Sequence, residues 1–107
     1  MAQSNLERAF LTHWHRFAPG ADEPVVELRF HPVRRWRLDF AFVDSLVAVE
    51  CEGGTWTRGR HTRGSGFRAD CEKYNAAAVL GWRIFRCTSG MLRDAPSEFV
   101  EMVREAL

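Results

Sequence analysis

The chain of 107 residues is long enough to build one hydrophobic core but not two, so we expect a single domain over residues 1–107. Hydrophobic residues make up 46% of the sequence and charged residues 27%, which excludes an intrinsically disordered chain. The net charge of +1 is not the footprint of a strongly basic nucleic-acid-binding domain, so the placement of the charges matters more than their sum.

The expected location is cytoplasmic, without membrane contact. The first ten residues lack the basic and apolar segments of a secretory signal, and no apolar run approaches the length of a membrane span. The cysteines, Cys51, Cys71 and Cys87, are odd in number and form no Cys-x-x-Cys pair, which argues against disulfides and against a thiolate zinc site. Each cysteine lies in an apolar phase of its segment, so we expect all three in the core.

Residues 4–17 predict an amphipathic helix that stops before Pro19 and Gly20. Its inward face is expected to carry apolar residues at helical spacing, namely Leu6, Phe10, Trp14 and Phe17. Ser4 and Glu7 have the spacing of a capping box. Glu7 therefore either caps the helix or reaches an active site, and capping is the favoured role.

Residues 25–30 alternate weakly and predict a strand that Pro32 interrupts. The arginines at 34–37, Arg35 among them, then either contact phosphate or solvate the strand end. Residues 38–54 predict a hairpin, with two alternating runs on either side of Asp44 and Ser45. A four-residue connection over 43–46 would keep the same register.

In that register Phe40 faces Val49, and Asp39 faces Glu50. Directly opposed like charges destabilise a strand pair, and Glu52 lies two residues further along on the same face as Glu50. A divalent cation would offset this repulsion, since carboxylate oxygens suit magnesium, manganese and calcium. The alternative is ordinary ion pairing, with Arg37 opposite Glu52 and with Asp39 held by Arg35 or Arg37.

Residues 53–66 show no periodicity, and their glycines predict an irregular loop that begins directly after the carboxylates. Arginine can fork onto phosphate oxygens and an indole ring can stack on a base. The expected DNA contacts in this loop are therefore Trp56, Arg58, Arg60 and Arg63. His61, in the middle of the loop, is either a functional group that assists proton transfer or contacts phosphate, or a solvated histidine, and its place beside the carboxylates favours a functional role.

A second helix is predicted from residue 67 to a stop near Gly81. Its expected inward face holds Phe67, Cys71, Tyr74 and Ala78. Lys73, the only lysine among 15 Lys and Arg residues, lies on an adjoining stripe with Asp70. Lys73 either pairs with Asp70 along the helix or points into the site.

The remaining elements are a strand over 82–87, a turn at 88–90 and a last helix over 95–107, with Pro96 in its first turn. The order is helix, strand, strand, strand, helix, strand, helix. A helical crossover between the third and fourth strands makes those two parallel. The predicted fold class is therefore α/β, with a mixed central sheet flanked by helices.

Asp39, followed by Glu50, Cys51 and Glu52 within this order of elements, resembles the PD-(D/E)XK nuclease superfamily. The segment VECEGGTWTRGRHTRGSGFRADCEKYNAAAVLGWRIFR is similar to small phage and bacterial endonucleases, and the compact Holliday-junction resolvases and very-short-patch-repair nucleases look closest. The match covers residues 34–86, about half of the chain. The resemblance implies a three-layer, restriction-endonuclease-like core.

The resemblance further implies an endonuclease that hydrolyses DNA phosphodiester bonds with Mg²⁺ or Mn²⁺. Asp39 and Glu50 would hold the metal, with the Cys51 carbonyl and Glu52 completing its shell. Glu52 stands where the family usually has a lysine, so it is an added ligand, or the lysine has moved to Lys73, or the site is inactive. Lys73 or His61 would orient the attacking water or stabilise the transition state.

We expect either cleavage that is selective for branched or nicked DNA or targeting by a partner, because so small a domain leaves little surface for base recognition. A homodimer is expected if both strands are cut. The alternative is a degenerate nuclease fold that binds DNA without cutting it. A glycosidase with two carboxylates is a more remote class, since an arginine-rich loop suits phosphate better than sugar.

Overall fold

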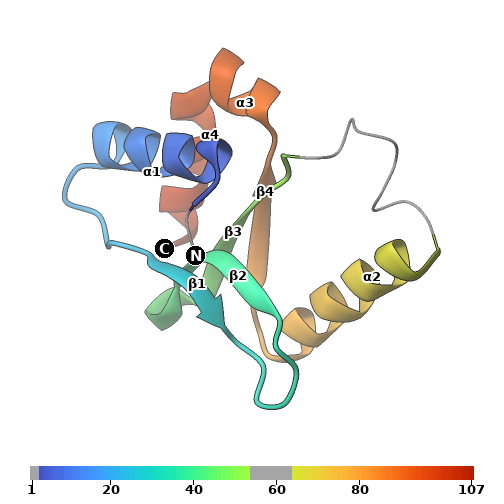
Figure 1. The fold of residues 1–107 in the computed structure, drawn as a ribbon. Coiled ribbons are helices and arrows are strands. Elements are labelled where there is room, and N and C mark those ends of the chain that lie inside the picture. The colour runs from blue at the N-terminus through green and yellow to red at the C-terminus, as the bar shows by residue number, and fades with distance from the viewer. Residues whose placement is uncertain (1–2, 54–63) are drawn as a thin grey trace.

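The computed structural model describes residues 3–53 and 64–107 and contains one mixed sheet with helices on both faces (Figure 1). The elements are α1 (Asn5–Phe17), β1 (Val25–Arg29), β2 (Arg37–Phe42), the 3-10 turn η1 (Val43–Ser45), β3 (Val47–Cys51), α2 (Gly64–Val79), β4 (Arg83–Cys87), α3 (Ser89–Asp94) and α4 (Pro96–Ala106). The strand order is β1-β2-β3-β4, with antiparallel pairs except for the parallel pair of β3 and β4. The α/β class and the mixed sheet are confirmed.

The first helix begins where its capping residues predict. The Ser4 hydroxyl accepts a hydrogen bond from the Glu7 amide, and the Glu7 carboxylate accepts one from the Ser4 amide, which completes the capping box. Phe10 and Trp14 are buried, and Leu6 and Phe17 pack against the same core. The predicted inward face of α1 is therefore confirmed.

The hairpin of β2 and β3 has the predicted register, with Phe40 opposite Val49 and Phe42 opposite Val47. The connection is the four-residue form, in which η1 is followed by Leu46 in the left-handed conformation, at φ 55°. Because a slip of one residue would exchange the two faces of a strand, this register determines which side chains meet the helices.

The core fills the space between the sheet and the group of α1, α3 and α4, which lie together in Figure 1. Phe10 of α1 lies 4.9 Å, centroid to centroid, from Phe40, and 6.0 Å from Phe99 of α4. Trp14 lies 4.9 Å from Phe42, and its indole N–H donates to the Asp22 carbonyl at 3.0 Å. Burial of these aromatic rings contributes to the hydrophobic stabilisation of the fold.

On the opposite face of the sheet β2 and β3 carry small and acidic residues, and α2 covers this face. Ala41, Ala48 and Glu50 are buried there, so the sheet is the middle of three layers (Figure 1). Figure 1 shows α2 on the side of the sheet away from α1, α3 and α4. The finer arrangement implied by the family resemblance stays a prediction.

The predicted inward face of α2 is wrong. Phe67 is 53% exposed, and Cys71 and Ala78 are exposed as well, whereas Ala77 is fully buried. The helix therefore turns the stripe of Lys73 and Ala77 toward the sheet, with Tyr74 partly buried beside them. The physical reason is the partner surface, because a buried carboxylate requires a cation and the adjacent alanines leave room for one, whereas the predicted stripe contains no cationic residue.

Two further expectations are corrected. The helix α2 starts at Gly64, inside the stretch predicted as loop, and residues 89–94 form α3 where a turn was predicted. Thr88 caps α3 by accepting a hydrogen bond from the Met91 amide at 3.2 Å. Of the cysteines, Cys87 is buried and Cys51 half-buried, but Cys71 is exposed and so is not a core residue. None of the described helices combines the length and hydropathy needed to cross a bilayer.

Candidate active site

The candidate site lies where β2 and β3 separate. The paired residues of this hairpin run from Phe42 and Val47 to Phe40 and Val49, although β2 begins at Arg37 and β3 ends at Cys51. Beyond the last pair, β2 continues beside β1 and β3 continues beside β4. We call the opening between the two strands the β2–β3 fork, and Asp39 and Glu50 lie in it.

Each carboxylate in the fork accepts a hydrogen bond from the opposite strand. The Asp39 amide donates to Glu50 Oε2 at 2.7 Å, and the Cys51 amide donates to Asp39 Oδ2 at 2.8 Å. These bonds replace backbone carbonyls as partners for the two amides, which would otherwise be costly to bury. The predicted convergence of Asp39 and Glu50 is therefore confirmed, and both side chains are held in fixed positions.

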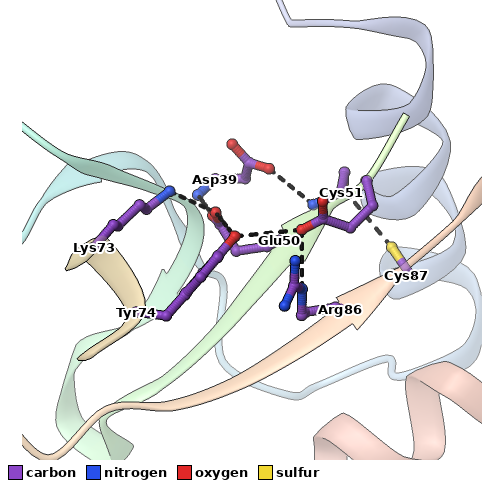
Figure 2. Close-up of polar contacts among 8 residues, drawn as sticks. Asp39, Glu50, Cys51, Lys73, Tyr74, Arg86 and Cys87 are labelled. Atoms are coloured by element: carbon purple, nitrogen blue, oxygen red, sulfur yellow. Dashed lines mark hydrogen bonds and ion pairs between the residues drawn. The ribbon is translucent and has the colours of Figure 1, made fainter. Parts of the chain in front are cut away.

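Glu50 is only 4% exposed and is neutralised by α2. Lys73 Nζ donates to Glu50 Oε1 at 2.6 Å, and the Tyr74 hydroxyl donates to the same oxygen at 3.1 Å (Figure 2). A buried carboxylate requires such partners, because desolvation without them is expensive. Of the two roles predicted for Lys73, the structure therefore has the one in which it points into the site.

Glu52 is bound by a different cation. Its Oε2 accepts from Arg86 Nε of β4 at 3.1 Å and from the Tyr74 hydroxyl at 3.3 Å. The Arg86 guanidinium also lies 4.6 Å from the centre of the Tyr74 ring. Tyr74 thus bridges Glu50 and Glu52, as Figure 2 shows for its bond to Glu50.

Asp39 is the carboxyl group of the fork whose charge is least compensated. Burial raises its pKa to about 7, with further increases from the charge of Glu50 and from the charge and hydrogen bonding of Glu7, against a lowering by the Cys51 amide. Glu7 therefore caps α1 and also lies close enough to Asp39 to raise the pKa of that carboxyl.

The polar groups around the carboxylates stay protonated at neutral pH. Burial raises the pKa of the Tyr74 phenol above its ordinary value, and the charges of Glu50 and Glu52 raise it further. A hydrogen bond with Cys87 and then burial raise the pKa of the Cys51 thiol, whose sulfur lies 3.8 Å from that of Cys87. Tyr74 is therefore a donor, and Cys51 is no thiolate ligand, which leaves its backbone as the group available to the site.

The ion pairs considered as alternatives to a metal are not the ones that form. Arg37 pairs with Glu27 of β1, so it holds neither Glu52 nor Asp39. Arg35 is exposed and has no ion pair within the described part of the chain. The predicted contacts Trp56, Arg58, Arg60, Arg63 and His61 lie outside the described residues.

Tyr74 and Arg86 belong to the site but were not identified from the sequence. Tyr74 had been placed on the apolar face of its helix, although it follows Lys73 directly. Arg86 could have been found from the parallel register, which sets Glu50 of β3 opposite Arg86 of β4. The alternation of side chains along β3 and β4 places Arg86 on the same face of the sheet as Glu50, and this pattern could have identified Arg86.

The donor set fits a hard divalent cation held by few protein ligands. No three His, Cys, Asp or Glu side chains over residues 3–53 and 64–107 are grouped as a complete ligand set. Magnesium is commonly held by one or two carboxylates, with waters and substrate phosphate completing the shell. The incompletely compensated charge of Asp39 beside Glu50 is the feature that such an ion would neutralise.

Comparison of the chain with family models, with curated proteins and with solved structures found no match. The assignment of a function therefore depends on the residues and their geometry.

Proposed function

We propose that this protein is a divalent-metal-dependent endonuclease that hydrolyses DNA phosphodiester bonds, with preference for branched or nicked DNA. The observation that supports it best is the β2–β3 fork, in which Asp39 and Glu50 are fixed by opposing backbone amides at 2.7 and 2.8 Å and a lysine lies against one of them. Carboxylate oxygens that can bind a metal ion, next to a lysine ammonium group, form a site suited to metal-assisted hydrolysis.

In this proposal Asp39 and Glu50 hold Mg²⁺ or Mn²⁺, and the Cys51 carbonyl and water complete the shell. The ion would lower the pKa of a bound water and stabilise the charge of the phosphate. Glu7 is the nearby carboxylate able to accept the proton of that water, since it already interacts with Asp39. Glu52 accepts hydrogen bonds from Arg86 and Tyr74, and in this proposal it helps to position Tyr74 rather than binding the metal.

Lys73 is the proposed replacement for the lysine that the PD-(D/E)XK nucleases, which the sequence resembles, usually carry at the position of Glu52. Its Nζ lies 2.6 Å from Glu50 and its side chain is 17% exposed, so it is both anchored at the site and reachable from solvent. An ammonium placed there can donate to a phosphate oxygen or orient the water. While Lys73 acts on the phosphate or the water, the Tyr74 hydroxyl keeps the Glu50 carboxylate in place.

DNA contacts are proposed for Arg35, and for Trp56, Arg58, Arg60, Arg63 and His61 in the segment that follows Glu52. These residue types bind phosphate oxygens or stack on bases without reading sequence. A homodimer is proposed only for cleavage of both strands.

The test is a nicking assay on supercoiled plasmid and on a four-way junction, with Mg²⁺ or Mn²⁺ and with EDTA. The expected result is metal-dependent nicking that EDTA abolishes and that falls by at least 100-fold in Asp39→Asn and Glu50→Gln. Glu101→Gln, an exposed acid on α4, is the matched control and should retain activity. Nicking that survives in both site variants would overturn the proposal.

A DNA-binding module without cleavage is the second candidate, favoured by the ion pairs from Lys73 to Glu50 and from Arg86 to Glu52, which neutralise two acids without a metal. It predicts DNA binding that is unchanged by EDTA, together with no nicking under any metal. Nicking by the wild-type protein that is lost in Asp39→Asn excludes this candidate.

A further inference from the structure

The connection between β1 and β2 is a strongly basic projection. Residues 30–36 extend past the strand ends on the side of the molecule away from α1, α3 and α4, and we call this segment the β1–β2 tip (Figure 1). Arg34 and Arg35 lie in the tip, and Arg29 and Arg37 face each other at its base. Of these, Arg37 pairs with Glu27, whereas Arg29, Arg34 and Arg35 are exposed and have no carboxylate partner within the described part of the chain.

Aromatic rings hold the tip in one conformation. The Phe30 and Trp36 rings are nearly parallel, at 14° and 6.4 Å between centroids, and the His31 ring meets Trp36 edge-on at 5.2 Å. His31 Nδ1 accepts the amides of Val33 at 3.2 Å and Arg34 at 2.9 Å. The Arg34 guanidinium lies 4.0 Å from the centre of the Trp36 ring, so its planar fork is oriented before any ligand binds.

The Arg34 guanidinium is oriented by Trp36 and has no carboxylate partner among the described residues, and Arg29 and Arg35 near it have none either. Such a group of arginines is suited to binding several phosphates in a row. Arginine binds phosphate oxygens with two parallel hydrogen bonds, and the cost of ordering the side chain is smaller when stacking has already fixed it. A carboxylate-bearing protein would also satisfy one arginine. A regularly spaced polyanion satisfies several at once, and the proposed function supplies such a polymer, the phosphodiester chain of DNA.

We propose that the β1–β2 tip is a binding site for the sugar–phosphate backbone of DNA, with Arg34 and Arg35 contacting phosphates and Trp36 positioning Arg34. This inference rests on the proposed function for the identity of the polymer. Arg35 precedes Asp39 by four residues, which span at most about 14 Å of extended chain. Since successive phosphates of one strand advance by about 3.4 Å along the helix axis, the main chain of the tip lies within roughly four nucleotide spacings of Asp39, and the tip would contact DNA close to the bond cut there.

The test measures binding of a fluorescent 30-base-pair duplex and of its single strand by anisotropy in EDTA, over a range of salt. In Arg34→Ala/Arg35→Ala we expect affinity at low salt to fall at least tenfold for both probes. The slope of log K against log salt should become smaller in magnitude by about 2, because each phosphate contact contributes about 0.9 for duplex DNA. Trp36→Leu should weaken binding less, while Trp36→Phe, which keeps an aromatic face, should restore most of it.

The matched control is Arg93→Ala/Arg104→Ala, which removes the same charge from α3 and α4. If this control lowers affinity and slope as much as the tip variant, net charge explains the effect and the tip site is overturned. Losses confined to the single strand would also overturn it, because they would indicate base stacking rather than backbone binding.

The assay separates this inference from the proposed function. Nicking by the wild-type protein, with unchanged DNA binding in the tip variant, refutes the tip alone. Weakened binding in the tip variant, with no nicking under any metal, refutes the nuclease while keeping the tip.

Discussion

The Asp39 carboxyl group links stability to pH. Its pKa is about 7 in the folded protein and 3.8 as an unperturbed group. Between about pH 4 and 7 the folded protein therefore holds a proton that the unfolded chain has lost, and the free energy of unfolding falls as pH rises. We expect the melting temperature in EDTA to decrease from pH 4.5 to 7.5, and to decrease less in Asp39→Asn.

Asp44→Asn, in exposed η1, should follow the wild-type protein. A dependence that Asp39→Asn leaves unchanged would place the titrating group elsewhere.

The ion pair of Lys73 and Glu50 should be costly to break. Lys73→Met leaves a carboxylate that is 4% exposed without its cation, for which a loss of about 3–5 kcal/mol of unfolding free energy is typical. Lys73→Met/Glu50→Gln should regain most of the loss, since neither charge is then left unpaired. Urea denaturation measures both. Arg68→Met, which breaks the exposed pair with Glu72, is the control, with an expected cost of about 0.2–0.5 kcal/mol. Equal losses in Lys73→Met and Arg68→Met would contradict this account.

Single residues differ in how far the sequence predicts them. Asp39 and Glu50 follow from strand alternation and a two-strand register, which are local rules. The contact of Lys73 with Glu50 joins residues 23 positions apart, so it depends on how α2 sits on the sheet. The pairing of Arg37 with Glu27 replaced the expected partners because β1 is the neighbour on that side of β2.

Among the elements, α2 shows why an apolar stripe alone does not identify the buried face. The sequence offered Phe67, Cys71, Tyr74 and Ala78, but the sheet below presents Ala41, Ala48 and Glu50. The face of a helix that becomes buried depends on the surface against which it packs. The hairpin pattern predicted only the part of that surface formed by β2 and β3. By contrast, α1 and the β2 and β3 hairpin were predicted correctly, because their caps and alternation agree with their tertiary partners.

The observed orientation of α2 makes a direct prediction. Ala77 is fully buried, so Ala77→Leu should overpack the interface with the sheet and cost about 1–3 kcal/mol. Ala78→Leu, on the exposed side one residue away, should change stability by less than about 0.5 kcal/mol. Chemical denaturation compares the two. The opposite ranking would show that the helix packs through its apolar stripe after all.

At the scale of the whole molecule, the proposed metal should act as a folding ligand. An ion that binds the folded protein alone, at 100 times its dissociation constant, adds about 2.7 kcal/mol. For a domain of this size that corresponds to a rise in melting temperature of about 10 °C or more. Scanning calorimetry with Mg²⁺, Mn²⁺ or Ca²⁺ should show this rise in the wild-type protein at pH 7.5 and lose it in Asp39→Asn. Glu101→Gln should keep it, and a rise that persists in Asp39→Asn would place the ion at another site.

The fork divides the sheet into two ribbons, β1 with β2 and β3 with β4, which share a short seam of three residue pairs. Past the seam, side-chain acids rather than main-chain carbonyls span the opening. A bound ion that attracts the Asp39 and Glu50 carboxylates would weaken their hydrogen bonds to the main-chain amides of the opposite strand. If the proposed metal binds there, its occupancy and the hydrogen bonds that join the two ribbons are linked, so the separation of β2 from β3 would depend on what the fork holds.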